Sequence, residues 1–391
     1  MATGSSDLRY SLEALAGFLI GNLTIFSLPL YIGALMDGLG ADERQAGLVC
    51  SLEIGAVAVS CVLFSGWLDK LPLRRLGIAG VCLAATGNLL SLSQDALVYL
   101  SVLRIFCGIG SGMCLAACSA IISRASDPDR VAGAVVGLNT VLMVMVIAAI
   151  SFMKQRFMFD GVTGIYLIVL VLAFFPLLML PGTATGTEVH APSKEQFDSR
   201  SVFRFGVFGV GLLFIYCVVE GSIWSFSERS GVNLGLTDTR IGLLLAAAQV
   251  AGLCGAAVSA AAGKRIRRDI PLVTSSIVMG IAGYLVYNTG QTWIYELSIL
   301  GFSFAFFLGF PYLIGGCAML DSEGRWAARA TGINLMGAAT APFLAGNIIT
   351  ASGYGELGLF IIILALICAA GGLVFSAGLR RHSYPEPQAS A

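Results

Sequence analysis

The sequence predicts an all-α membrane protein with twelve transmembrane helices in two pseudo-twofold-related six-helix bundles. Its composition, its long apolar stretches and an internal repeat lead to this prediction. Of the 391 residues, 57% are hydrophobic and 12% are charged, which leaves too few polar side chains to cover a soluble globule. The net charge is zero, and the 10 Cys and 2 His show no metal-ligand spacing. We therefore expect no nucleic-acid partner, no metal and no cofactor.

The two halves of the chain resemble each other at an offset of 195 residues. The first matching stretch pairs Leu39, Gly40, Gly47 and Leu48 with Leu234, Gly235, Gly242 and Leu243. The second pairs Arg130, Ala132, Gly137 and Asn139 with Arg325, Ala327, Gly332 and Asn334. Two similar bundles packed face to face leave a cleft between them, and membrane transporters hold their substrate in such a cleft.

Apolar windows of about 20 residues, the length needed to cross about 30 Å of hydrocarbon, occur at twelve places. In chain order they are 12–35, 44–68, 74–93, 96–123, 130–153, 161–181, 203–227, 239–262, 271–289, 292–319, 327–350 and 354–378. The first window is followed by eleven more and has no cleavage site, so we interpret it as an anchor. The predicted domains are a bundle over 1–181, a polar cytoplasmic linker over 182–202, a bundle over 203–381 and a disordered tail over 382–391.

The distribution of positive charge predicts the orientation of these spans. Of the 23 Lys and Arg residues, one, Arg104, lies deep inside a span, and five lie in the outer loops or at the outer ends of spans: Arg44, Lys154, Arg156, Arg229 and Arg240. The others fall in inner segments if both termini are inside. Because positive residues resist translocation, we expect a multi-pass protein of the inner (plasma) membrane with both termini in the cytoplasm.

The loop between the second and third spans carries a recognisable pattern. It contains Gly66, Asp69, Lys70, Arg74 and Arg75. This loop resembles the major facilitator superfamily signature Gly-x-Leu-x-Asp-Arg-x-Gly-Arg-Arg, with Lys70 in place of the first Arg and Leu73 in place of the second Gly. The resemblance implies a conformational gate, in which Asp69 pairs with basic groups in one state and releases them in another. The plain alternative is an ordinary positive-inside loop.

A second match lies on the fourth span. The stretch from Arg104 to Gly110 is similar to the superfamily pattern Arg-x-x-Gln-Gly-x-Gly, with Cys107 replacing Gln. In that family the pattern is linked to proton coupling. A third signature, the Gly-x-x-x-Gly-Pro-x-x-Gly of many drug/proton antiporters, is missing, because Leu138 and Asn139 follow Gly133 and Gly137.

Three ionisable residues lie deep in the predicted spans: Glu53, Arg104 and Glu220. A charge at the bilayer centre costs at least about 2.5–3.5 kcal/mol, so such residues face a cavity or a partner. The resemblance implies that spans one, four, seven and ten line the cavity, which puts Arg104 and Glu220 on its wall. We predict a standing Glu53–Arg104 ion pair, with Glu220 carrying the transported proton. The alternatives are a purely structural pair and a Glu220 that reaches outward.

Neutral polar and aromatic residues are candidates for lining the cavity: Asn22, Asn139, Tyr216, Trp224, Gln249 and Asn334. Asn139 and Asn334 correspond under the repeat, and interhelical hydrogen bonding is the favoured alternative for this pair. Trp224 has an alternative role as an interfacial anchor.

The resemblance implies a secondary active transporter that works by alternating access. We expect a monomer in the lipid bilayer that takes up a small organic molecule, aromatic or carboxylate, with a proton. The alternative is a proton-driven drug or metabolite exporter, and a sensor that binds without transport is a third possibility. The sequence has no catalytic constellation and no nucleotide-binding motif, so we do not expect an enzyme or a primary pump.

Overall fold

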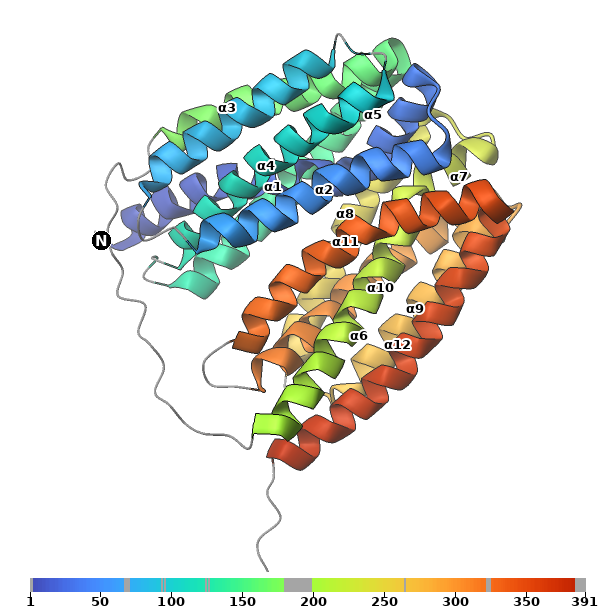
Figure 1. Cartoon of the computed structure of the whole chain (residues 1–391). Helices are drawn as coiled ribbons and strands as arrows, with labels where there is room; N and C mark the ends of the chain where they lie inside the picture. Colours follow the sequence, from blue (N-terminus) through green and yellow to red (C-terminus); the bar gives the residue numbers. More distant parts are fainter. Residues whose placement is uncertain are drawn as a thin grey trace, which may run out of the picture.

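The computed structural model describes residues 3–66, 71–92, 94, 96–123, 125, 127–178, 199–263, 265–320 and 325–383. No strand occurs among them, and Figure 1 shows the helices lying roughly side by side. The helices are α1 (Thr3–Leu39), α2 (Glu43–Ser65), α3 (Leu73–Ser91), α4 (Leu97–Ile122), α5 (Pro128–Leu177), α6 (Ser199–Ser225), α7 (Ser227–Asn233), α8 (Asp238–Ala262), α9 (Asp269–Asn288), α10 (Thr292–Ala318), α11 (Arg325–Ser352) and α12 (Tyr354–Ser383). Most of the predicted linker and tail lies outside the described residues.

Ten of these helices are long and apolar enough to cross a membrane, which confirms the predicted all-helical membrane class. The number differs from the predicted twelve for two reasons. The helix α3 is not among the ten, and residues 130–177 count as one span of 48 residues. A straight helix of that length would measure about 70 Å, more than twice the hydrocarbon thickness.

The helix α5 reverses direction at Met158. This residue has φ 47° and ψ −123°, the one non-helical backbone conformation inside α5. Beyond it, Gly161 lies against the backbone of Met153 and Lys154, so closely that an added Cβ would overlap the Met153 carbonyl oxygen. Residues eight apart in a straight helix are about 12 Å apart, so the two arms of α5 fold back on each other. The predicted loop between 153 and 161 is therefore a tight helical reversal.

The internal repeat is visible in two equivalent turns. Gly40 and Gly235, which are 195 residues apart, both have a positive φ, of 65° and 79°. Only glycine adopts this left-handed conformation without strain, which explains why both turns contain it. Two residues later in each turn, Asp42 and Thr237 accept hydrogen bonds at the N-termini of α2 and α8. The sequence match at Gly40 and Gly235 thus corresponds to one turn built twice.

The helices pack in two groups that follow the halves of the sequence. We call residues 3–178 the N-terminal half and residues 199–383 the C-terminal half. In Figure 1 the N-terminal half runs from blue to green and the C-terminal half from yellow-green to red. The halves meet where α2 packs on α11, where α5 packs on α8, and where α1 reaches α6 and α7. We call the end where α1 ends and α2 begins the cluster end, and the opposite end the terminal end.

Candidate functional site

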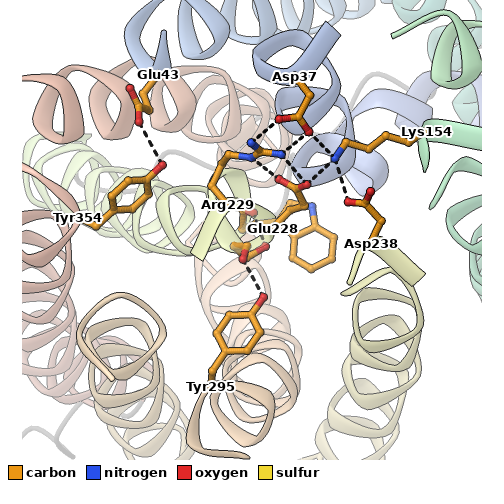
Figure 2. A network of polar contacts seen from close by, with 10 residues as sticks. Asp37, Glu43, Lys154, Glu228, Arg229, Asp238, Tyr295 and Tyr354 are labelled. Carbon is orange, nitrogen blue, oxygen red and sulfur yellow. Dashed lines mark hydrogen bonds and ion pairs between the residues drawn. The ribbon is translucent and has the colours of Figure 1, made fainter. Parts of the chain in front are cut away.

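Five charged residues from both halves converge at the cluster end. Asp37 lies near the end of α1 and Lys154 lies just before the reversal of α5. Glu228 and Arg229 lie on the short helix α7, and Asp238 begins α8. Figure 2 shows their side chains pointing toward one another between the helices. We call these five residues the interhalf ion cluster.

Lys154 lies among the three carboxylates of the cluster. Its Nζ is 2.8 Å from Asp37 Oδ2, 2.7 Å from Glu228 Oε1 and 3.1 Å from Asp238 Oδ1. An ammonium group has three N–H donors, so each one has its own carboxylate acceptor. Two of these three ion pairs connect the N-terminal half to the C-terminal half.

Arg229, which lies in the C-terminal half, binds two of these carboxylates, Asp37 and Glu228. Its Nη1 and Nη2 donate to the two oxygens of Asp37, each at 2.7 Å, which is the bidentate geometry of a strong charge-assisted pair. Its Nε donates to Glu228 at 2.6 Å. Lys154–Asp37 and Arg229–Glu228 are therefore pairs within one half, whereas Arg229–Asp37, Lys154–Glu228 and Lys154–Asp238 join the halves.

The centre of the cluster is buried. The Glu228 side chain is 0% exposed and that of Lys154 is 2% exposed, whereas Asp37 and Asp238 remain partly open. Glu228 reaches this position because it packs against Gly33 of α1, where an added Cβ would overlap its carboxylate. Charges this deep are tolerated only when each is paired and hydrogen-bonded.

Backbone contacts close the same end around the cluster. A Cβ added to Gly346 of α11 would overlap the carbonyl oxygen of Glu43 at the start of α2. Ser151 of α5 donates to the carbonyl oxygen of Asp238 at 2.6 Å. Residues 43 and 151 become 238 and 346 when 195 is added, so the two contacts are equivalent under the repeat. Small residues let the helices approach closely on both sides of the cluster.

Trp224 extends the contact between the two halves from the cluster end toward the middle of the molecule. Its indole N–H donates to the carbonyl oxygen of Ile25 on α1 at 3.0 Å, and its ring packs against Phe302. The side chain is 5% exposed. Trp224, predicted to line a cavity, thus bridges the two halves in this conformation.

Glu53 and Arg104 lie together inside the N-terminal half. Arg104 Nη1 is 3.8 Å from Glu53 Oε2, and both side chains are buried. Glu53 accepts a hydrogen bond from Thr24 at 2.8 Å. Arg104 donates to Asn88 at 3.1 Å and to Ser91 at 2.6 Å, both on α3. With 0% of its surface exposed, Arg104 points toward α3 and not toward the C-terminal half.

This arrangement leads to a prediction about stability. We expect Arg104→Gln to lower the free energy of unfolding by about 3–5 kcal/mol, because it leaves the Glu53 carboxylate buried without a cation. The additional change Glu53→Gln should recover most of that loss. Thermal unfolding in detergent measures both, with Arg156→Gln on the exposed surface as the control. A double variant no more stable than Arg104→Gln would contradict this interpretation.

Glu220 lies on α6 one helical turn before Trp224, on the side toward the terminal end. Its side chain is half-buried, and it accepts no hydrogen bond within the part of the chain that the structure describes. Cys217, one turn earlier, donates to Asn334 Oδ1 on α11 at 3.2 Å. Tyr216 points into the C-terminal half, where its hydroxyl lies within hydrogen-bonding distance of Ser275 Oγ, at 3.1 Å, and of the Phe306 carbonyl oxygen, at 3.2 Å.

The remaining candidates lie on three helices. Asn22 is half-buried on α1, and its amide donates to the Phe18 carbonyl at 2.9 Å. Asn139 is buried on α5, and its Oδ1 has no hydrogen-bond partner among the described residues. Gln249 is half-buried on α8. The structure does not bring these three residues into contact with the interhalf ion cluster.

The predicted conformational gate is only partly described. Gly66 is the C-cap of α2, and Arg74 and Arg75 lie exposed in the first turn of α3. Asp69 and Lys70 lie outside the described residues, so the proposed exchange of pairs at this loop stays a prediction.

The interhalf ion cluster is not among the sites predicted from the sequence. Lys154 and Arg229 are predicted only as outer-loop charges, and Asp37, Glu228 and Asp238 are not singled out. One available signal is that all five residues lie at the same predicted end of their spans, three acidic and two basic. Opposite charges at one end of a bundle indicate pairing there.

The fold is that of a multi-pass helical membrane protein with two halves joined at the cluster end. The Major Facilitator Superfamily model matches residues 14–311, and the chain belongs to that superfamily. No curated protein sequence matches the chain. A solved structure similar to it is a bacterial homologue of the human lysosomal transporter Spinster, in an inward-facing and unoccupied conformation. That protein is 13% identical, with a TM-score of 0.72 over 98% of this chain and 99% of that chain.

The nucleoside transporter NupG is similar as well, with 11% identity and a TM-score of 0.69 over 95% of this chain and 98% of that chain. Identities this low show the fold alone. The family membership confirms the resemblance seen at Gly66–Arg75 and around Arg104. The chain is therefore a membrane-embedded transporter of small molecules and not an enzyme.

Proposed function

We propose that this transporter couples proton movement to the uptake of a small organic molecule by alternating access. The observation that carries the proposal is that the two halves are tied together at the cluster end by the buried interhalf ion cluster. Closure at one end is what an alternating-access cycle requires of one of its states. The proposal includes twelve spans, counting α3 and the two arms of α5, in two six-helix bundles that act as a monomer.

The pseudo-twofold relation between the bundles is supported by paired features 195 residues apart. These are the left-handed turns at Gly40 and Gly235 and the contacts made by Ser151 and Gly346. We further propose that the cluster end faces the outside of the inner (plasma) membrane and that both termini are cytoplasmic, following the distribution of Lys and Arg. The described conformation is then the inward-facing one.

The pairing within the cluster suggests how it opens. When the halves separate, Lys154 keeps Asp37 in the N-terminal half and Arg229 keeps Glu228 in the C-terminal half. Only Asp238, which is already 26% exposed, loses its cation. An exchange from interhalf to intrahalf partners avoids leaving buried charges alone, so the two states differ modestly in free energy.

Glu220 is the residue that we propose to carry the proton. It lies one helical turn from the Trp224 contact, on the side toward the terminal end. It is half-buried and has no hydrogen-bonding partner among the described residues. Binding a proton removes the charge of Glu220, so the neutral carboxyl needs no ion-pair partner while the protein changes conformation. Uptake is favoured over export by the missing antiporter signature around Gly133 and Gly137.

The test is transport by purified protein in liposomes, using a labelled compound selected by a thermal-shift screen of metabolites. We expect Glu220→Gln to abolish accumulation driven by a pH gradient but to retain counterflow, which needs no net proton movement. Glu356→Gln, on the exposed start of α12, is the matched control and should behave like the unaltered protein. Full gradient-driven accumulation by Glu220→Gln would exclude the coupling role.

A further inference from the structure

A second polar site lies at the terminal end of the C-terminal half, far along the helices from the interhalf ion cluster. There the ends of α8, α10 and α12 and the segment before α9 enclose a pocket of about 820 Å³. This volume lies in the range of pockets that hold drug-sized ligands. None of its lining residues comes from the N-terminal half or from α6. The pocket is thus separate from the space between the halves.

The pocket carries more positive than negative charge. Arg267, Arg268 and Arg380 line it. Asp269 pairs with Arg267 at 2.7 Å and with Arg380 at 3.4 Å. One carboxylate therefore serves two guanidinium groups, and Arg268 has no ion-pair partner in the described part of the chain. Among the described residues, the three guanidinium groups thus outnumber the one carboxylate, which leaves a net positive charge.

Two buried polar atoms in this pocket have no hydrogen-bond partner among the described residues. One is Nη1 of Arg268, which lies near Gly315 of α10, 3.7 Å from where a Cβ at that glycine would be. The other is Oγ of Ser376 on α12, whose residue is 2% exposed. Both are donors, and unsatisfied buried donors are costly unless a ligand or water accepts from them. Their combination indicates an oxygen-rich anionic ligand.

The mouth of the pocket is apolar and open toward the surface of the bundle. Ile266 and Met319 line it and are 42% and 52% exposed. Ile270, just beyond, is 52% exposed. The helices α8, α10 and α12 all end near this pocket. Because a membrane-spanning helix ends close to the headgroup region, we expect the pocket to lie at that depth. An occupant with a charged group inside and an apolar chain outside fits this arrangement.

We propose that this pocket binds the phosphate headgroup of an anionic phospholipid, with Arg268 and Ser376 as its donors. The guanidinium of Arg268 forms charge-assisted hydrogen bonds to the phosphate oxygens. The acyl chains leave the pocket past Ile266 and Met319 into the bilayer. Basic pockets between transmembrane helices at the membrane surface bind anionic headgroups in this way.

The test is native mass spectrometry of the detergent-solubilised protein titrated with phosphatidylglycerol. We expect one lipid to bind with at least about ten-fold higher affinity than phosphatidylcholine with the same acyl chains, since a charge-assisted contact is at stake. Arg268→Gln should lower phosphatidylglycerol affinity about ten-fold, and Ser376→Ala should lower it by a smaller factor. Arg265→Gln, on the same segment but exposed and outside the pocket, is the matched control and should not change it.

Three outcomes would overturn the proposal. Equal affinity for the two lipids would show that charge is not recognised, and equal loss in Arg265→Gln would show only general surface attraction. Displacement of the lipid by millimolar inorganic phosphate, with the same dependence on Arg268, would show that the occupant is a free anion. Unaltered thermal unfolding of the lipid-free variants establishes that any loss of binding is not a loss of folding.

Discussion

Replacing Arg229 with Gln is expected to open the cluster end of this transporter. The change removes the bidentate pair with Asp37 and leaves the buried Glu228 with Lys154 as its only cation. Breaking a buried ion pair on one side costs about 3–5 kcal/mol. The Arg229–Asp37 pair exists only in the closed state, whereas separation of the halves removes Gly33 from Glu228 and exposes that carboxylate to water. Most of the cost therefore falls on the closed state, and the ratio of closed to open molecules should fall about a hundred-fold or more.

Hydrogen–deuterium exchange followed by mass spectrometry measures this opening without labels. Amide exchange should become faster in α7, at the end of α1 and around Met158, the segments that carry the cluster. The control is Arg240→Gln, which breaks the 2.7 Å pair with Glu296. That pair lies within the C-terminal half and is exposed, so its loss should leave the closure intact. Exchange that stays at its original rate in Arg229→Gln would show that the cluster does not hold the halves together.

The sequence predicts the helices better than it predicts their ends. Long apolar windows give the spans because hydrocarbon imposes a minimum length on each of them. The repeat predicts the matched turns at Gly40 and Gly235, since a left-handed turn requires glycine in both copies. The chain reversal between 153 and 161 is predicted as a loop, but its tight form at Met158 is not, because the residues on both sides are helical and a non-glycine residue with positive φ has no sequence signal.

The candidate site could not be assembled from the sequence for a different reason. Asp37, Lys154 and Glu228 are widely separated along the chain, and each one looks like a solvated charge at a helix end. Their burial depends on how closely α1 and α7 approach at Gly33, which is a property of the packed halves. The residues that the sequence did mark as buried charges, Glu53 and Arg104, pair within one half. Hydropathy reveals a charge inside a span but not the direction in which it points.

Exchanging the charges of Asp37 and Arg229 is expected to have the opposite effect to Arg229→Gln. The double variant Asp37→Arg with Arg229→Asp keeps all the interhalf pairs attractive. The pair between residues 37 and 229 has its signs reversed, and the two interhalf pairs of Lys154 are unchanged. The pairs within each half become repulsive, because residue 37 then repels Lys154 and residue 229 repels Glu228. Separation of the halves would leave like charges together on both sides. The closed state should therefore be favoured more strongly than in the unaltered protein.

The double variant should combine slow amide exchange at the cluster end with loss of counterflow in liposomes. Each single variant, Asp37→Arg or Arg229→Asp, should instead exchange faster, because each places like charges across the interface in the closed state. This pattern separates partner exchange from simple bracing. If the cluster only braces the halves, the double variant restores both the exchange rates and the transport of the unaltered protein. If the cluster must change partners in each cycle, the double variant shows slow amide exchange at the cluster end but does not transport, because it closes well and cannot open.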